Sequence, residues 1–232
     1  MLNKINFKSL YSSGESDSPI SFFTDALSNS ISFDLGLGFF SSASFNVLSI
    51  GFAKFISNGG KMRLYINQYL SEEDYEIFTS HPDIVENKVI DSFTSMLNVL
   101  TKRDKQFFNC LSYLIYTNRI EVKIVIPNSG GIAHQKFGIF TDAAKNKVSF
   151  IGSLNLTASA LLSKNIESIS CNSSWKGAAE TINDYQQLFD KYFSGDKEGI
   201  TVIPANRLTK EKHFPQRKRK RCLTMRKNLL KS

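Results

Sequence analysis

The sequence predicts an α/β fold, a sandwich of helices around a mixed central sheet. The first observation behind this prediction is that segments with a period of two alternate along the chain with segments of helical spacing. The second is that 41% of the 232 residues are hydrophobic and 12% are aromatic, so one domain can bury a substantial core. The third is that no stretch approaches about 18 unbroken apolar residues, which argues against a membrane-spanning helix.

The first half of the chain begins with residues 1–19, which mix Ser, Gly, Asp and Pro. We expect them to form a flexible N-terminal segment ahead of a domain over 20–205. Apolar residues alternate within 32–40, which predicts a strand, and its two glycines indicate a close approach of another backbone. The other elements expected in this half are a helix over 20–28, a helix over 44–57, a strand over 62–66, a helix that starts at 71–74 and a longer helical run over about 83–117.

The second half is richer in strands. Residues 119–127 alternate strongly and predict one strand. Residues 133–141 and 147–151 predict a hairpin, because the intervening 142–146 has the composition of a turn. The elements expected after the hairpin are a helix over 158–164, a strand over 166–171 and a closing helix over 177–193.

The net charge of +8 is concentrated at the C-terminus. Residues 208–232 hold ten of the 29 basic side chains and one of the 21 acidic ones, which leaves 19 basic and 20 acidic side chains before them. We therefore expect a nearly neutral domain followed by a basic tail over 206–232. A candidate nucleic-acid-binding cluster in this tail consists of Arg217, Lys218, Arg219, Lys220 and Arg221. The alternatives are a solvated tail, or a linker severed from a larger protein that carries a helicase.

The cysteines and the N-terminus indicate a cytoplasmic protein. Cys110, Cys171 and Cys222 are odd in number and far apart, so they fit neither a disulfide framework nor a zinc site. The first residues are too polar for a signal peptide. We expect no metal and no cofactor.

One group of polar residues carries the chemistry. His134 and Lys136 lie two apart in an expected strand, so both side chains should point to one face. The hairpin returns the chain, so that Ser153 and Asn155 can arrive beside them. Glu167 could accept a hydrogen bond from the second imidazole nitrogen and fix the tautomer.

These groups match the needs of phosphodiester hydrolysis without a metal. The imidazole can attack phosphorus or carry a proton, because its protonation changes near neutral pH. A lysine places positive charge on the non-bridging oxygens. Hydroxyl and amide donors stabilise the charge that grows in the transition state.

The residues H134-Q-K136, G152-S-L-N155 and N165-I-E167 resemble the phospholipase D superfamily signature, the HKD motif His-x-Lys-x4-Asp-x6-Gly-Ser-x-Asn. The resemblance extends over about 117–195. It implies a phospholipase D-like α/β/α sandwich, a covalent phosphohistidine, and a lysine and an asparagine that hold the phosphate. Stretches of the first half, among them D34LGLGFFSSASFNVLS, are similar to the PLD-like domains of bacterial restriction systems, which occur alone or ahead of a helicase.

The sequence departs from this signature in two places. Five residues separate Lys136 from Asp142 and nine separate Asp142 from Gly152, so we place Asp142 in the hairpin turn and give it no catalytic role. The chain also holds one His-x-Lys where family active sites use two. The resemblance then implies a homodimer in which the His134 side chains of two copies face each other.

Together these features predict a metal-independent phosphodiesterase, foremost a DNA endonuclease of a restriction or defence system. The expected partners are DNA, a second copy of the chain and a helicase or ATPase, without a membrane. One alternative is a phospholipase D-type lipid hydrolase. The other is a catalytically silent nucleic-acid-binding subunit whose affinity resides in the basic tail.

Overall fold

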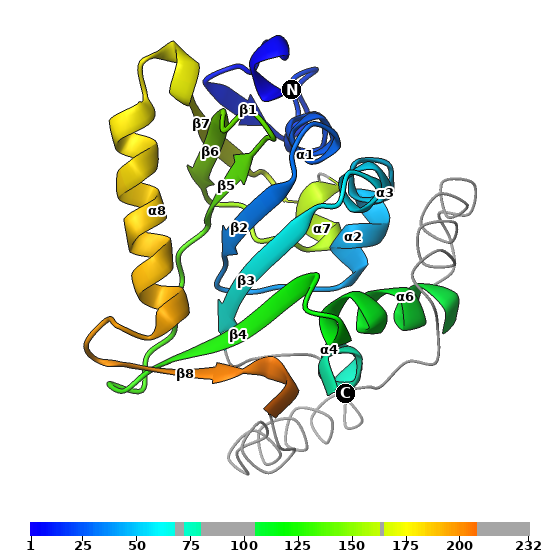
Figure 1. The fold of residues 1–232 in the computed structure, drawn as a ribbon, viewed down its shortest axis with the longest axis vertical. Coiled ribbons are helices and arrows are strands. Elements are labelled where there is room, and N and C mark those ends of the chain that lie inside the picture. The colour runs from blue at the N-terminus through cyan, green and yellow to red at the C-terminus, as the bar shows by residue number, and fades with distance from the viewer. Residues whose placement is uncertain (68–71, 80–104, 163–164, 208–232) are drawn as a thin grey trace, which may run out of the picture.

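The computed structural model describes residues 1–67, 72–79, 105–162 and 165–207. Its centre is an eight-stranded mixed sheet with the strand order β1-β7-β6-β5-β2-β3-β4-β8 (Figure 1). The strands are β1 (Leu10–Ser12), β2 (Ser32–Gly36), β3 (Lys61–Asn67), β4 (Ile120–Pro127), β5 (Phe137–Thr141), β6 (Lys147–Gly152), β7 (Ser168–Ser173) and β8 (Ile200–Pro204). The pairs β2–β3 and β3–β4 are parallel, and the other neighbouring pairs are antiparallel.

Helices cover both faces of the sheet, which confirms the predicted sandwich. One long helix, α8, lies along one face, and the opposite face carries α1, α2, α3 and α7 (Figure 1). The helices are α1 (Pro19–Ser28), α2 (Ala43–Val47), α3 (Ser49–Ser57), α4 (Glu72–Thr79), α6 (Lys105–Tyr116), α7 (Ala158–Leu161) and α8 (Ala179–Ser194), with 3-10 turns η1 (Leu2–Lys4), η3 (Ser174–Lys176) and η4 (Ala205–Arg207). Within the described residues, no helix is both long and apolar enough to cross a bilayer.

Phenylalanine rings build the larger of two cores, between the sheet and the α1–α3 side. Phe33 of β2 stacks on Phe140 of β5 with ring centroids 3.8 Å apart. Phe22 and Phe23 of α1 pack edge-on against Phe150 of β6. Because β2 and β5 place every second side chain on this face, the alternation read in the sequence becomes a buried layer of rings.

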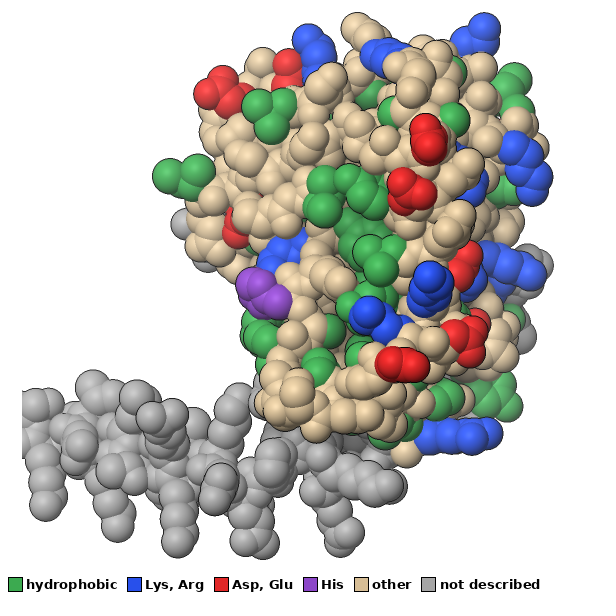
Figure 2. Space-filling view, turned by 90° about the vertical axis from the view of Figure 1, so that its left-hand side faces the viewer, with side chains coloured by type: hydrophobic (Ala, Val, Ile, Leu, Met, Phe, Trp, Pro, Cys, Tyr) green, Lys and Arg blue, Asp and Glu red, His purple; other side chains and the backbone are tan. Residues whose placement is uncertain are grey.

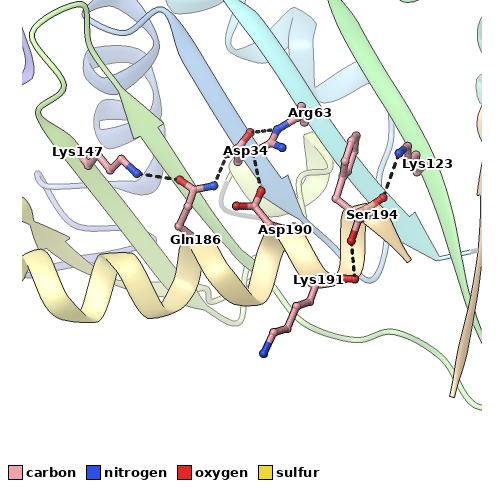
Figure 3. A network of polar contacts seen from close by, with 9 residues as sticks. Asp34, Arg63, Lys123, Lys147, Gln186, Asp190, Lys191 and Ser194 are labelled. Carbon is pink, nitrogen blue, oxygen red and sulfur yellow. Dashed lines mark hydrogen bonds and ion pairs between the residues drawn. The ribbon is translucent and has the colours of Figure 1, made fainter. Parts of the chain in front are cut away.

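A polar network holds α8 on its face of the sheet (Figure 3). Arg63 of β3 makes two hydrogen bonds, of 2.7 and 2.6 Å, to the buried carboxylate of Asp34 on β2. The same guanidinium reaches Asp190 of α8 at 2.9 Å, and Gln186 of α8 donates to Asp34 at 2.7 Å. The bond to Asp34 raises the pKa of Arg63 although burial opposes this. These charge-assisted bonds fix the position of α8 across the strands.

The N-terminal segment corrects one prediction. Residues 1–19 do not form a flexible segment, because the side chains of Leu2, Phe7 and Tyr11 are buried. Strand β1 extends the sheet by pairing with β7. The sequence predicted flexibility from the polar residues, whereas the few apolar ones between them decide the packing.

Other elements differ in their bounds. The helix expected over 44–57 divides at Leu48 into α2 and α3, and the strand expected from 133 begins only at Phe137. Strand β8 was not expected. Much of the helical run expected over 83–117 lies outside the described residues, as does the tail from 208 onward.

Asp142 closes the hairpin between β5 and β6 and is almost fully buried, with 1% of its surface exposed. Its carboxylate accepts bonds of 2.9 Å from the backbone amides of Leu2, Ala144 and Asn146 and from the Asn146 side chain. The turn placement is therefore right, and this residue also ties the N-terminus to the hairpin. Burial alone would raise the pKa of Asp142, but these bonds outweigh it and the pKa lies below its ordinary value.

We expect Asp142→Asn to lower the free energy of unfolding by about 2 kcal/mol at pH 7, because a charged acceptor of several bonds is lost. Since the folded-state pKa is depressed, the ionised form stabilises the fold fully above about pH 5, and this contribution is lost as the pH falls through the folded-state value. Urea unfolding of the wild type and of Asp142→Asn at pH 7, 5 and 3 should show that the difference between their free energies of unfolding becomes smaller as the pH falls. Asp17→Asn, at a half-exposed ion pair with Lys8, is the control, with an expected change within about 0.5 kcal/mol.

Candidate active site

The candidate site lies at the edge of the sheet where β2 and β6 end and β5 and β7 begin. His134 and Lys136 belong to an irregular segment, 131–136, that leads into β5. The backbone amide of Gly152, at the end of β6, donates to the carbonyl of Lys136 at 3.1 Å. The hairpin pairing thus continues past the strand and brings the Gly152–Asn155 segment beside the histidine.

Lys136 contacts His134 directly. Its Nζ lies 3.2 Å from both imidazole nitrogens and donates to the His134 carbonyl at 2.9 Å. Lys136 is buried, with 7% of its surface exposed, whereas His134 is exposed. Figure 2 shows a histidine side chain projecting from the surface. Burial lowers the pKa of Lys136, and the nearby charge of Glu167 opposes this shift. The result is a reachable imidazole backed by a fixed cation.

Ser153 and Glu167 form a second pair in the site. The Ser153 hydroxyl donates to Glu167 Oε2 at 2.5 Å and accepts from the backbone amide of Ser168 at 3.3 Å. The Glu167 carboxylate is thus bonded to the serine, and not to the second imidazole nitrogen as predicted. The reason is local, because Ser153 and Glu167 flank the end of the β6–β7 pairing and meet across it. Glu167 acts on the site through Ser153 and through its charge near Lys136.

Asn155 joins the site to the loop after β2. Its Oδ1 accepts a bond of 3.0 Å from the backbone amide of Phe39, and Phe40 bridges to Leu156. Because this bond uses the amide oxygen, the NH2 group of Asn155 is the part that can donate to a phosphate oxygen.

The loop after β2 is a part of the site that the motif did not include. The Phe39 ring stands edge-on to the imidazole of His134 with centroids 6.3 Å apart. A Cβ at Gly38 would lie 3.2 Å from the His134 Cα, so the backbone passes close to the histidine there. The two glycines in 32–40 were the sequence signal for this contact. They predicted that another backbone comes close, but not that it is the segment of His134.

A groove of about 360 Å³ opens beside the histidine. Its walls include His134, Ile132, Tyr192, Lys197 and Ile200. Across the part of the chain that the structure describes, no three His, Cys, Asp or Glu side chains gather where they could hold a metal ion. The basic cluster Arg217–Arg221 lies outside the described residues.

A protein-family model described as "Cardiolipin synthase, PLD-like domain" matches residues 66–193. A search of curated proteins finds no match. The fold is similar to that of phosphatidylserine synthase from Haemophilus influenzae Rd KW20, with a TM-score of 0.51 and 10% identity over 97% of this chain and 48% of the synthase. The chain therefore spans about half the length of that enzyme.

Two smaller solved structures give lower scores. NucT from Helicobacter pylori has a TM-score of 0.47 and 16% identity over 79% of this chain and 90% of its own. Nuc from Salmonella typhimurium, described as a phospholipase D family member, has a TM-score of 0.47 and 13% identity over 84% of this chain and 96% of its own.

Proposed function

This chain belongs to the PLD-like family, because the family model matches residues 66–193, and we propose that it is a metal-independent phosphodiesterase acting through His134. The observation that carries this proposal is the exposed imidazole of His134 with the Lys136 ammonium 3.2 Å from both its nitrogens. A nucleophile needs access to the phosphorus atom, and the buried cation beside it favours the negative charge of a phosphodiester.

The proposed reaction has two displacements. An imidazole nitrogen of His134 attacks phosphorus, a P–N bond forms, and the P–O bond to the leaving alcohol breaks as that oxygen takes up a proton. Water then attacks the phosphohistidine, gives up a proton, and breaks the P–N bond. Lys136 and the amide donor of Asn155 stabilise the non-bridging oxygens in both steps. The Ser153–Glu167 pair holds the serine hydroxyl at the rim of the site.

We propose DNA as the substrate, in a restriction or defence role. The support is the resemblance of the D34LGLGFFSSASFNVLS stretch to the PLD-like domains of restriction systems, together with the basic cluster Arg217–Arg221. A phospholipid is the second candidate, because the matching family model takes its description from a lipid synthase and the fold resembles phosphatidylserine synthase.

The two substrates are separated by one experiment in EDTA. Plasmid DNA, liposomes of phosphatidylcholine and phosphatidylglycerol, and bis(p-nitrophenyl) phosphate are incubated separately with the purified protein. We expect hydrolysis of the small diester and of DNA, and intact lipid. Lipid cleavage with intact DNA would replace the nuclease proposal by the lipid one. Activity that appeared only on addition of Mg²⁺ would contradict the metal-independent mechanism.

We further propose a homodimer in which His134 of the partner subunit protonates the leaving oxygen. One support is that the chain holds one His-x-Lys, whereas the two proton transfers call for a second acid/base group. Another is that exposed apolar side chains surround the site. Ile166, next to Glu167, is 92% exposed, and Ile132 and Phe39 are 41% and 38% exposed. Such side chains around a polar site are typical of an interface.

We expect Ile166→Asp to weaken this dimer, because it places a charge where an apolar contact would be desolvated. Sedimentation velocity should show the wild type as a dimer and the variant shifted toward monomer, with hydrolysis of the small diester falling in parallel. Ile50→Asp, on helix α3, is the control, since Ile50 is also exposed, at 61%, and is not among the apolar side chains around the site. A monomeric wild type, or an equal effect of both variants, would contradict the proposed interface.

A further inference from the structure

The segment that carries the histidine has little regular structure of its own. Residues 131–136 form no strand, yet they hold the Lys136 ammonium against the His134 imidazole. A nucleophile on an irregular segment needs anchors from its surroundings, because misplacement by about 1 Å can cost 100-fold in rate. Lys136 anchors one side of this segment through its contacts with His134. Gln135 points to the other side, where two tyrosines hold it.

Both ends of the Gln135 amide are bonded. The Tyr65 hydroxyl donates to Gln135 Oε1 at 3.1 Å, and Gln135 Nε2 donates to the Tyr192 hydroxyl at 3.1 Å. The two tyrosine rings are stacked, with centroids 5.4 Å apart and planes 21° from parallel. One phenol therefore meets the amide oxygen and the other its nitrogen, so both ends of the Gln135 amide are held.

The two tyrosines stand on rigid supports. Tyr65 of β3 is fully buried, and its ring lies across Gly36 of β2, where a Cβ would overlap the phenol. Tyr192 belongs to α8, which the Asp34–Arg63–Asp190 network fixes to the sheet. Burial raises the pKa of Tyr65, with a further contribution from Tyr192, so its hydroxyl remains a donor throughout the range of an assay. Gln135, next to the histidine, is therefore bonded to the sheet through Tyr65 and to α8 through Tyr192.

We propose that Gln135, clamped between Tyr65 and Tyr192, is a positioning residue that sets the orientation of His134. In this role Gln135 takes no part in bond making or breaking and acts through the backbone it shares with His134. This inference rests on the proposed function for its effect on rate, but the orientation of the imidazole can be measured without activity.

The kinetic test uses bis(p-nitrophenyl) phosphate in EDTA with Tyr65→Phe, which removes one hydroxyl, and Gln135→Met, which keeps length and removes both bonds. We expect kcat to fall about 10-fold and 100-fold, respectively, with KM within about twofold. The double variant should be no slower than Gln135→Met, since the Tyr65 hydroxyl then has no amide to hold. Tyr185→Phe is the control, because Tyr185 lies on α8 like Tyr192 but packs on Phe137. The proposal would be overturned if the loss of kcat in the double variant were the product of the two single losses, or if KM alone changed.

The second test reads the imidazole itself by NMR. The ring signal of His134 is assigned by its loss in His134→Ala and followed in both variants. We expect it to sharpen and to move toward the shift of an unstructured peptide in Gln135→Met, and to stay in place in Tyr185→Phe. An unmoved signal in Gln135→Met would overturn the positioning role. An inactive wild type with a moved signal would instead contradict the proposed function and leave the positioning role supported.

Discussion

His134→Ala should reduce hydrolysis of plasmid DNA and of bis(p-nitrophenyl) phosphate in EDTA by about 10⁴-fold or more. Loss of a covalent nucleophile removes the whole two-step route, and substitutions of this kind have the largest kinetic effects known for single side chains. In this protein the effect should exceed that of Lys136→Met, because the lysine stabilises charge without forming a bond to phosphorus. Initial rates of p-nitrophenolate release give kcat/KM for both variants.

The fold of the variant must be intact for this result to count. His134 is exposed, so its replacement should leave the urea unfolding curve within about 0.5 kcal/mol of the wild type. His81→Ala, which replaces a histidine outside the motif and outside the described residues, is the control and should keep full activity. Retained cleavage by His134→Ala would remove the histidine from the mechanism and would favour the alternative of a nucleic-acid-binding protein with a contaminating nuclease.

The elements that the sequence predicted well are those with a clear local pattern of apolar and turn residues. Strand β4 alternates over its first five residues, and β5 and β6 flank a turn organised by Asp142, so each could be predicted from local sequence. Strand β1 could not, because it is three residues long and is stabilised by pairing with β7, about 160 residues away. The Leu2 amide is likewise bonded to a residue far away in the sequence, the carboxylate of Asp142.

The residues of the site likewise include some that the sequence could place together and some that it could not. His134, Lys136, Ser153 and Asn155 lie on one hairpin and its extension, so spacing alone was enough to bring them together. The predicted partner of Glu167 was wrong because the β6–β7 register, which the sequence does not reveal, places the Ser153 hydroxyl against the Glu167 carboxylate. Tyr65 and Tyr192 join the site from β3 and α8, and no local pattern connects them to Gln135. Their contacts with Gln135 depend on the strand order, which places β3 two strands from β5, and on the packing of α8 against the sheet.

Mixing wild type with His134→Ala should inactivate more sites than dilution alone would. If each working site needs one histidine as nucleophile and the other as acid, only wild-type pairs are active, and activity follows the square of the wild-type fraction after subunit exchange. With one part wild type and nine parts variant, the square law predicts about 100-fold less activity, whereas independent chains give about 10-fold less. The readout is the rate of bis(p-nitrophenyl) phosphate hydrolysis at constant total protein concentration.

Subunit exchange has to be shown for this comparison to be decisive. Chains labelled with donor and acceptor fluorophores report exchange by energy transfer, and the rate is read once that signal is constant. Adding Ile166→Asp to the His134→Ala chain provides the matched control, because a variant that does not pair should dilute the wild type linearly. A linear dependence with complete exchange would mean that one histidine per chain is enough, and the proton for the leaving oxygen would then have to come from another group of the same chain.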